Sequence, residues 1–184
     1  MEAAARILER RGLDGFNTNA VAERAGVSVG SLYQYFPSKE ALVAALSARE
    51  RGLLAAEVAA AAGAATGLSL EDAMRRLARV AIRRQLARPV LSRILDFEEQ
   101  RLGLEDGDRA TTSDMVVHVA VLLCAHRSAL TVTDMDEAAF DVIAVARALI
   151  DASCGRGPVD ADALERRVVR ATLGYLTSRA NVGP

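Results

Sequence analysis

Hydrophobic residues recur at helical spacing along most of this chain, with charged and polar residues between them. Glycine, proline and capping residues divide the pattern into segments. No segment alternates between apolar and polar residues for long enough to indicate a strand. The sequence therefore predicts an all-α fold of about nine helices.

The expected boundaries follow from the caps and breakers. Gly12 and Gly26 are predicted to end the first two helices, Pro37 the third, and Gly155–Pro158 the eighth. The first four predicted helices are Glu2–Arg11, a helix capped by Thr18 that runs to Ala25, the residues between Ser28 and Pro37, and a helix that begins after Ser38 and runs to about Ala62. The other five are a helix capped by Ser69 that runs to Ala87, a helix that opens at Pro89 and carries Asp96–Arg101, a helix capped by Thr112 or Ser113 that runs to about Ala129, Met135–Cys154 with Asp134 or Asp136 at its start, and Asp160–Leu176.

Composition supports a globular helical protein. Of the 184 residues, 51% are hydrophobic, 26% are charged and 4% are aromatic. The net charge of −1 gives no general attraction for nucleic acid, so any DNA binding must depend on local chemistry. Cys124 and Cys154 are isolated thiols, and no hydrophobic signal region or long apolar run is present. We expect a cytoplasmic protein with no membrane partner.

The segment from Thr18 to Phe36 predicts two short helices that meet at a tight turn. Ala22 is small where the helices must approach, and Gly26 permits the positive φ of a sharp corner. Four apolar residues are expected to close a small core with the first helix: Val21, Val27, Leu32 and Phe36.

This packing leaves a polar face on the third helix that is free to enter a major groove. It is expected to contain Ser28, Val29, Ser31, Gln34 and Tyr35, while Gly30 permits close approach of a partner. Thr18 and Ser28 are predicted N-caps, and Tyr33 offers a phenol donor. Lys39 is the only lysine, and its place in a first helical turn opposes the macrodipole unless a phosphate lies nearby.

Residues 22–42, AERAGVSVGSLYQYFPSKEAL, closely resemble the DNA-binding signature of the TetR family of transcriptional regulators, and the resemblance covers about Ile7–Leu46. It implies phosphate contacts by Thr18, Tyr33 and Lys39. It implies base or groove contacts by Asn19, Ser28, Val29, Ser31 and Tyr35. Members commonly carry a basic arm before the first helix, and this sequence starts almost on that helix.

The resemblance implies a helix-turn-helix domain at 1–46 and an effector-binding and dimerisation domain at 47–184. A homodimer would bind a pseudo-palindromic double-stranded operator, and a small hydrophobic effector would release it. Candidate ligand-binding residues are Met74, Leu77, Phe97, Met115, His118, Leu122 and Arg147. Candidate dimer-interface residues on the last two helices are Phe140, Ala144, Ala148, Leu164, Val168, Ala171, Thr172 and Tyr175.

Two alternatives remain at this level. A TetR-like dimer that binds ligands or proteins without an operator would fit the balanced N-terminal charge. A small enzyme would have to use His118 or the acidic cluster Asp96, Glu98 and Glu99, which an acidic helix surface explains more simply. His118, Cys124 and His126 do not stack on one helical face, so we expect no metal site. The sequence has no recognisable nucleophile, glycine-rich phosphate loop or triad, so we expect no catalytic residue and no cofactor.

Overall fold

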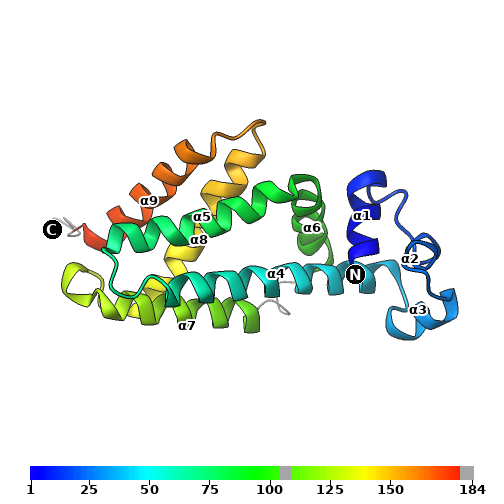
Figure 1. The fold of residues 1–184 in the computed structure, drawn as a ribbon, viewed down its shortest axis with the longest axis horizontal. Coiled ribbons are helices and arrows are strands. Elements are labelled where there is room, and N and C mark those ends of the chain that lie inside the picture. The colour runs from blue at the N-terminus through cyan, green and yellow to red at the C-terminus, as the bar shows by residue number, and fades with distance from the viewer. Residues whose placement is uncertain (104–108, 179–184) are drawn as a thin grey trace. The chain divides into compact units, whose positions relative to one another are not determined.

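The computed structural model describes residues 1–103 and 109–178, and nine α-helices with one 3-10 turn account for the regular structure in these ranges (Figure 1). The predicted all-α fold is confirmed. The helices are α1 (Glu2–Arg11), α2 (Thr18–Ala25), α3 (Val29–Tyr35), α4 (Lys39–Gly63), α5 (Leu70–Ala87), α6 (Pro89–Leu102), α7 (Arg109–Ala125), α8 (Met135–Cys154) and α9 (Ala161–Thr177).

Side-chain caps set the start of several helices. Asn17 caps α2, because its Oδ1 accepts from the amide of Ala20 at 2.8 Å. The prediction that Thr18 is this cap is wrong, since Thr18 is already the first residue of the helix. Asp134 and Asp160 cap α8 and α9 in the same way.

Helix α7 differs most from its predicted boundaries. It begins at Arg109 instead of Thr112 or Ser113, and it ends at Ala125, with a 3-10 turn over Arg127–Ala129. The change of helix type coincides with His126, whose amide donates to the carbonyl of Leu123 at 2.9 Å, a three-residue step.

The chain packs as two compact units. The N-terminal unit contains Met1–Leu53 and α6, and the C-terminal unit contains Leu54–Ala87 with α8, α9 and nearly all of α7. The division expected at residue 46 differs from this grouping, because Leu91 and Leu95 of α6 are buried in one core with α1 and the start of α4. Helix α4 is continuous across the boundary between the units.

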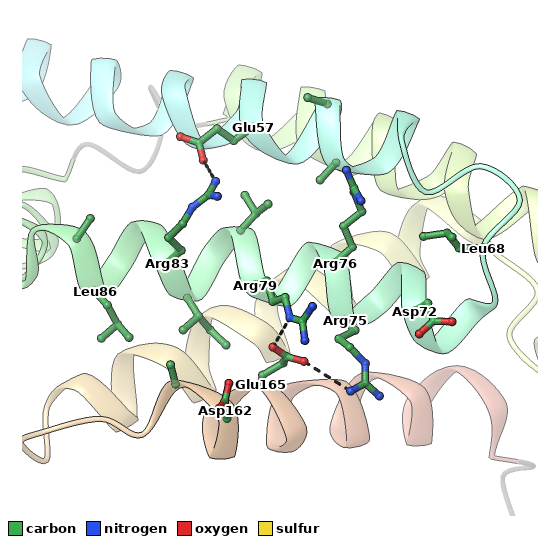
Figure 2. Close-up of a pocket in the computed structure, with 16 residues that line it drawn as sticks. Glu57, Leu68, Asp72, Arg75, Arg76, Arg79, Arg83, Leu86, Asp162 and Glu165 are labelled. Carbon is green, nitrogen blue, oxygen red and sulfur yellow. Dashed lines mark hydrogen bonds and ion pairs between the residues drawn. The ribbon is translucent and has the colours of Figure 1, made fainter.

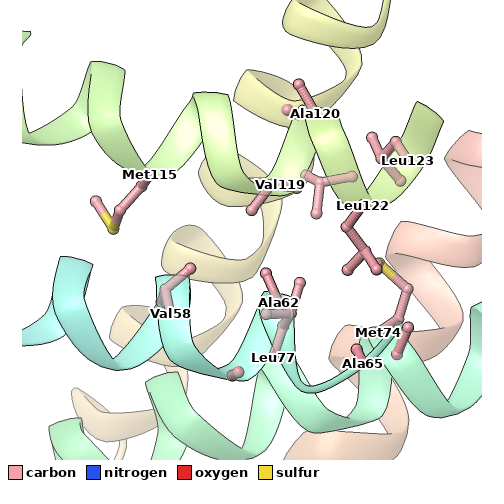
Figure 3. Close-up of a cluster of buried hydrophobic side chains, with 14 of the residues drawn as sticks. Val58, Ala62, Ala65, Met74, Leu77, Met115, Val119, Ala120, Leu122 and Leu123 are labelled. Carbon is pink, nitrogen blue, oxygen red and sulfur yellow. The ribbon is translucent and has the colours of Figure 1, made fainter. Parts of the chain in front are cut away.

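The C-terminal unit has a core rich in alanine, leucine and methionine. Val58 and Ala62 of α4, Leu77 of α5, and Val119 and Leu123 of α7 are all buried in it (Figure 3). A second cluster joins α5, α8 and α9 through Ile82, Ile150, Leu164 and Val168. Within the described residues, no helix is both long and apolar enough to cross a bilayer.

Candidate functional site

A sharp corner holds α2 against α3. Gly26 lies in the left-handed region at φ 69° and its amide donates to the carbonyls of Ala22 and Glu23, which ends α2. Val21 and Ala22 are buried at this corner, as expected. Val27 is not part of the small core as predicted, because it is 45% exposed beside the corner glycine.

Helix α3 exposes all of its side chains except that of Leu32. None of its residues is buried, and Tyr35 is 77% exposed while Tyr33 is 48% exposed. Val29, Gly30 and Ser31 are exposed as well. Only Leu32 and Phe36, which follows the helix, pack against the N-terminal core. A seven-residue helix of this kind is held by its neighbours and offers a short, fixed surface.

Ser28 fixes the start of α3. Its Oγ accepts from the amide of Ser31 at 3.0 Å and lies 2.8 Å from the Ser31 hydroxyl. The predicted cap at Ser28 is therefore confirmed. Asn19 is exposed on α2, whereas Thr18 is buried with 7% of its surface accessible, and its predicted phosphate contact stays a prediction.

Lys39 has a partner inside the protein. Its Nζ donates to the carbonyl oxygen of Leu13 in the turn after α1. This bond gives the ammonium group an acceptor within the protein, and a phosphate contact by Lys39 stays a prediction. Two N–H donors of the ammonium group remain for other acceptors.

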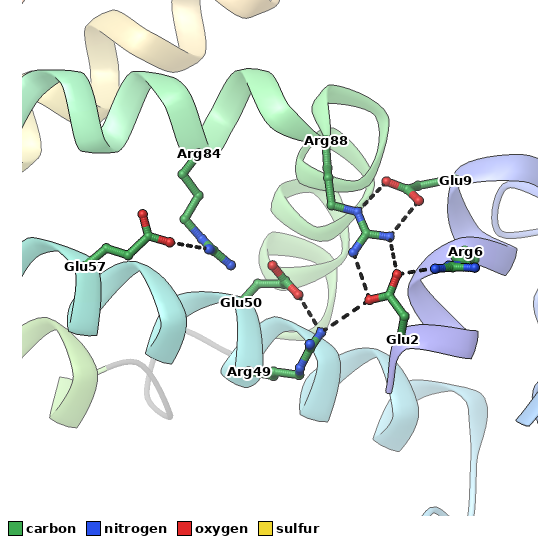
Figure 4. Close-up of polar contacts among 8 residues, drawn as sticks. All are labelled: Glu2, Arg6, Glu9, Arg49, Glu50, Glu57, Arg84 and Arg88. Carbon is green, nitrogen blue, oxygen red and sulfur yellow. Dashed lines mark hydrogen bonds and ion pairs between the residues drawn. The ribbon is translucent and has the colours of Figure 1, made fainter.

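An ion-pair network joins α1 to the start of α6 within the N-terminal unit (Figure 4). Arg88 donates from Nε to Oε1 of Glu9 at 2.6 Å and from Nη2 to Oε2 of Glu9 at 2.7 Å. It also lies 3.3 Å from Oε2 of Glu2. The hydrogen bonds from Arg88 lower the pKa of Glu9, and those from Arg6 and Arg88 lower the pKa of Glu2.

The acidic residues of α6 are not the solvated surface expected from the sequence. Glu98 is 2% exposed, and Arg101 donates to both of its carboxylate oxygens at 2.9 and 2.6 Å. Glu99 is also buried and accepts from Arg51 of α4. These carboxylates are thus engaged in arginine pairs inside the N-terminal unit, where buried charges require a partner.

The predicted ligand-binding residues fall into two groups. Met74, Leu77, Met115 and Leu122 are buried together in the core of the C-terminal unit (Figure 3). The structure does not bring the other three to this cluster: Phe97 belongs to the N-terminal unit and is 60% exposed, His118 is exposed, and Arg147 is exposed beside Asp151 at 3.6 Å.

The predicted dimer residues are also divided. Phe140, Ala144 and Ala148 are exposed along one side of α8, and Ala171 and Tyr175 lie on the outer part of α9. Three predicted residues face inward instead and are buried in the core of their own unit: Leu164, Val168 and Thr172. Leu164 and Val168 pack against residues of α5 and α8, and the Thr172 hydroxyl donates to the carbonyls of Val168 and Val169 within α9.

Sequence reasoning missed the charged pairs between distant helices, above all Arg88 with Glu9. It also missed the arginines of α5 at positions 75, 76, 79 and 83, although their helical spacing places them along one side of the helix. That spacing was a usable signal for a charged groove.

Comparison with known proteins agrees with this arrangement. Residues 1–46 match the N-terminal region of the bacterial regulatory proteins of the tetR family, and residues 69–176 match the tetracyclin repressor-like C-terminal domain. Over 50 residues the chain is 44% identical to the HTH-type transcriptional repressor KstR of Rhodococcus jostii, a stretch that is 27% of this chain and 24% of that repressor.

Solved structures share the fold over nearly the full length. The fatty acid degradation regulator FadR of Bacillus halodurans superimposes with a TM-score of 0.72 at 18% identity, covering 95% of this chain and 96% of that one. The regulator PfmR of Thermus thermophilus gives a TM-score of 0.64 at 18% identity, covering 94% and 95%. The chain belongs to the TetR family of transcriptional regulators.

Proposed function

We propose that this chain represses transcription by binding a pseudo-palindromic operator as a homodimer. The observation that carries the proposal is the exposed face of α3. Ser28 caps this helix, and the corner at Gly26 holds it against α2. Recognition helices of helix-turn-helix proteins read base edges in this way, through residues near the helix N-terminus. The short match to the repressor KstR supports repression over activation.

The proposed DNA contacts follow from exposure and chemistry. We assign base or groove contacts to Asn19, Ser28, Val29, Ser31 and Tyr35, and phosphate contacts to Tyr33 and Lys39. Gly30 supports close approach, because an added Cβ would meet only the Ser28 Oγ at 3.9 Å. Gly30 does not have a positive φ, so its backbone conformation does not require glycine. The close approach of a partner surface is therefore a sufficient reason for the missing side chain.

The proposed homodimer uses the exposed sides of α8 and α9. Phe140, Ala144 and Ala148 form a row at four-residue spacing, and small side chains let a second helix approach closely. Ala171 and Tyr175 extend this surface onto α9. The dimer would place two α3 helices about one DNA turn apart, which requires two related half-sites.

The proposed effector is a small hydrophobic molecule that enters the cluster around Met74, Leu77, Met115 and Leu122. Methionine side chains adapt to a guest more readily than branched ones. An effector that weakens operator binding between 5- and 150-fold needs about 1–3 kcal/mol of preference for the DNA-incompetent state. By linkage, operator DNA must weaken effector binding by the same factor, which calorimetry with and without DNA measures.

An electrophoretic mobility assay at low salt tests the central proposal, using DNA from the gene's own upstream region. We expect wild type and Arg156→Ala to retain a fragment, and Tyr35→Ala and Ser31→Ala to bind it about 5–150-fold more weakly, the effect of losing one base contact. If wild type retains no genomic fragment, the operator proposal fails. The balanced charge of residues 1–46 then favours a dimer that binds ligands or proteins without DNA.

A further inference from the structure

A groove of about 1070 Å³ lies along α5 in the C-terminal unit, between the end of α4 and the start of α9 (Figure 2). None of the predicted ligand-binding residues lines it. Its charged lining comes mainly from one side of α5, where Arg75, Arg76, Arg79 and Arg83 follow one another at helical spacing.

Four carboxylates also line the groove, and each has a local role. Glu165 is buried, accepts from Nε of Arg79 at 2.6 Å and lies 3.8 Å from Nη1 of Arg75. Asp72 and Asp162 lie in the first turns of α5 and α9, where the positive end of the helix macrodipole offsets their charge.

The fourth carboxylate, Glu57 of α4, is held by two arginines. Its Oε2 accepts from Arg83 at 2.8 Å, and its Oε1 accepts from Arg84 at 2.9 Å. The Arg83 side chain is 72% exposed, whereas that of Arg84 is 22% exposed. Arg83 can therefore turn to an external anion while Arg84 continues to neutralise Glu57.

Arg76 has no such partner. It is exposed and makes no hydrogen bond or ion pair with the side chains that the structure describes, those of residues 1–103 and 113–178. Figure 2 shows its side chain directed toward α4, as is that of Arg83. The groove residues of α4 are Glu57, already paired, and two alanines, Ala60 and Ala61, which carry no acceptor.

We propose that this groove along α5 binds an elongated small molecule with two or more anionic groups, either carboxylates or phosphates. Arg76 and Arg83, on the side of α5 that faces α4, hold the two ends of the molecule. The two arginines are seven residues apart, about 10 Å along the helix axis. Arginine suits both groups because its planar guanidinium makes paired hydrogen bonds to carboxylate or phosphate oxygens. The small side chains of Ala60 and Ala61, which line the groove from α4, leave room for the body of the ligand.

Isothermal titration calorimetry of the full chain at low ionic strength tests this site with two probes. Inorganic triphosphate represents phosphate ligands, and azelate, a straight-chain dicarboxylate, represents carboxylate ligands. We expect saturable binding of at least one probe, and the probe with the higher affinity identifies the anionic group. Arg76→Ala should weaken this binding about tenfold or more, and Arg83→Ala about three- to tenfold, as expected for the loss of charge-assisted hydrogen bonds.

The matched control is Arg156→Ala, which removes one exposed arginine from the turn after α8. It should leave the affinity within about twofold, since it removes the same charge but no contact. Arg76→Gln repeats the test with most of the side chain retained, and circular dichroism verifies folding. The proposal is overturned if neither probe binds wild type, or if Arg76→Ala and Arg76→Gln bind as Arg156→Ala does. The assay uses no DNA, so its outcome is independent of operator binding.

Discussion

Arg88 and Glu9 form a two-pronged ion pair, with hydrogen bonds of 2.6 and 2.7 Å, that ties the start of α6 to α1. The pair lies beside the buried contacts of Leu91 and Leu95 with the α1 side chains. Helix α6 is thus part of the unit that carries the helix-turn-helix, through both apolar packing and charge.

Arg88→Ala should lower the free energy of unfolding by about 1 kcal/mol at pH 7, as expected for a partly exposed network of charge-assisted hydrogen bonds. The folded-state pKa values of Glu9 and Glu2 are lowered from 4.5. Their stabilisation is therefore present above that pH and is lost as the pH falls through the folded-state values. Urea unfolding at pH 7 and pH 3 should show that the difference in free energy of unfolding between wild type and Arg88→Ala is smaller at pH 3.

Arg10→Ala is the control for this measurement, because Arg10 is an exposed arginine on α1, the helix that carries Glu2 and Glu9. A loss of stability from Arg88→Ala that is equal at both pH values would contradict the assigned role of the carboxylates.

Asn17→Ala should destabilise the protein by about 1 kcal/mol, the usual effect of losing an N-cap side chain. Asn17→Asp should retain most of the stability, since its carboxylate also accepts from the Ala20 amide. Thr18→Val keeps the shape of the buried neighbour and removes only its hydroxyl, so it should change stability less than Asn17→Ala. Thermal melting compares the three variants, and a larger loss from Thr18→Val would restore Thr18 as the cap.

Lys39 can be separated into a structural and a phosphate role by two substitutions. Lys39→Met removes both the charge and the hydrogen bond to Leu13, whereas Lys39→Gln removes the charge but keeps an N–H donor. If Lys39 also contacts a phosphate, both variants lower the slope of log K against log salt by about one unit.

The difference in stability between Lys39→Met and Lys39→Gln measures the structural role of Lys39, its hydrogen bond to Leu13. Lys39→Met should unfold more easily than Lys39→Gln, by about 1 kcal/mol for one hydrogen bond. Unchanged salt slopes in both variants would confine Lys39 to the contact between α4 and the turn after α1.

Ala144→Glu and Ala148→Glu should weaken the proposed homodimer at least about tenfold, because each places a charge at the centre of a close helix contact. Light scattering coupled to size-exclusion chromatography measures the mass. Ala56→Glu is the control, since Ala56 is exposed on α4. A dimer that survives both α8 substitutions would place the interface elsewhere.

Tyr175 donates from its hydroxyl to Oδ2 of Asp141 at 2.6 Å, and this hydrogen bond with nearby acidic residues raises the pKa of Tyr175 to about 12. The stabilisation is complete below the usual tyrosine pKa of 10 and is lost as the pH rises through about 12. Ultraviolet difference titration of wild type against Tyr175→Phe isolates this residue. Asp141→Asn should lower its pKa, and an unchanged value would contradict the assignment to Asp141.

The helices and the family could be predicted from short stretches of sequence. Gly12, Gly26, Asp134 and Asp160 act over a single turn, so their effect is readable without knowing what packs nearby. The segment from Thr18 to Phe36 is similarly local, since its corner depends on contacts between residues close in the chain.

Which side of each helix is buried depends on packing between distant parts of the chain. A periodic pattern shows that Leu164, Val168 and Ala171 lie near one another on α9, but two neighbouring sides of a helix can both be apolar. Packing under α5 and α8 buried the first two and left the third at the edge. Likewise, the grouping of α6 with α1 and the bond from Lys39 to Leu13 depend on residues far apart in the chain, whose meeting no local spacing specifies.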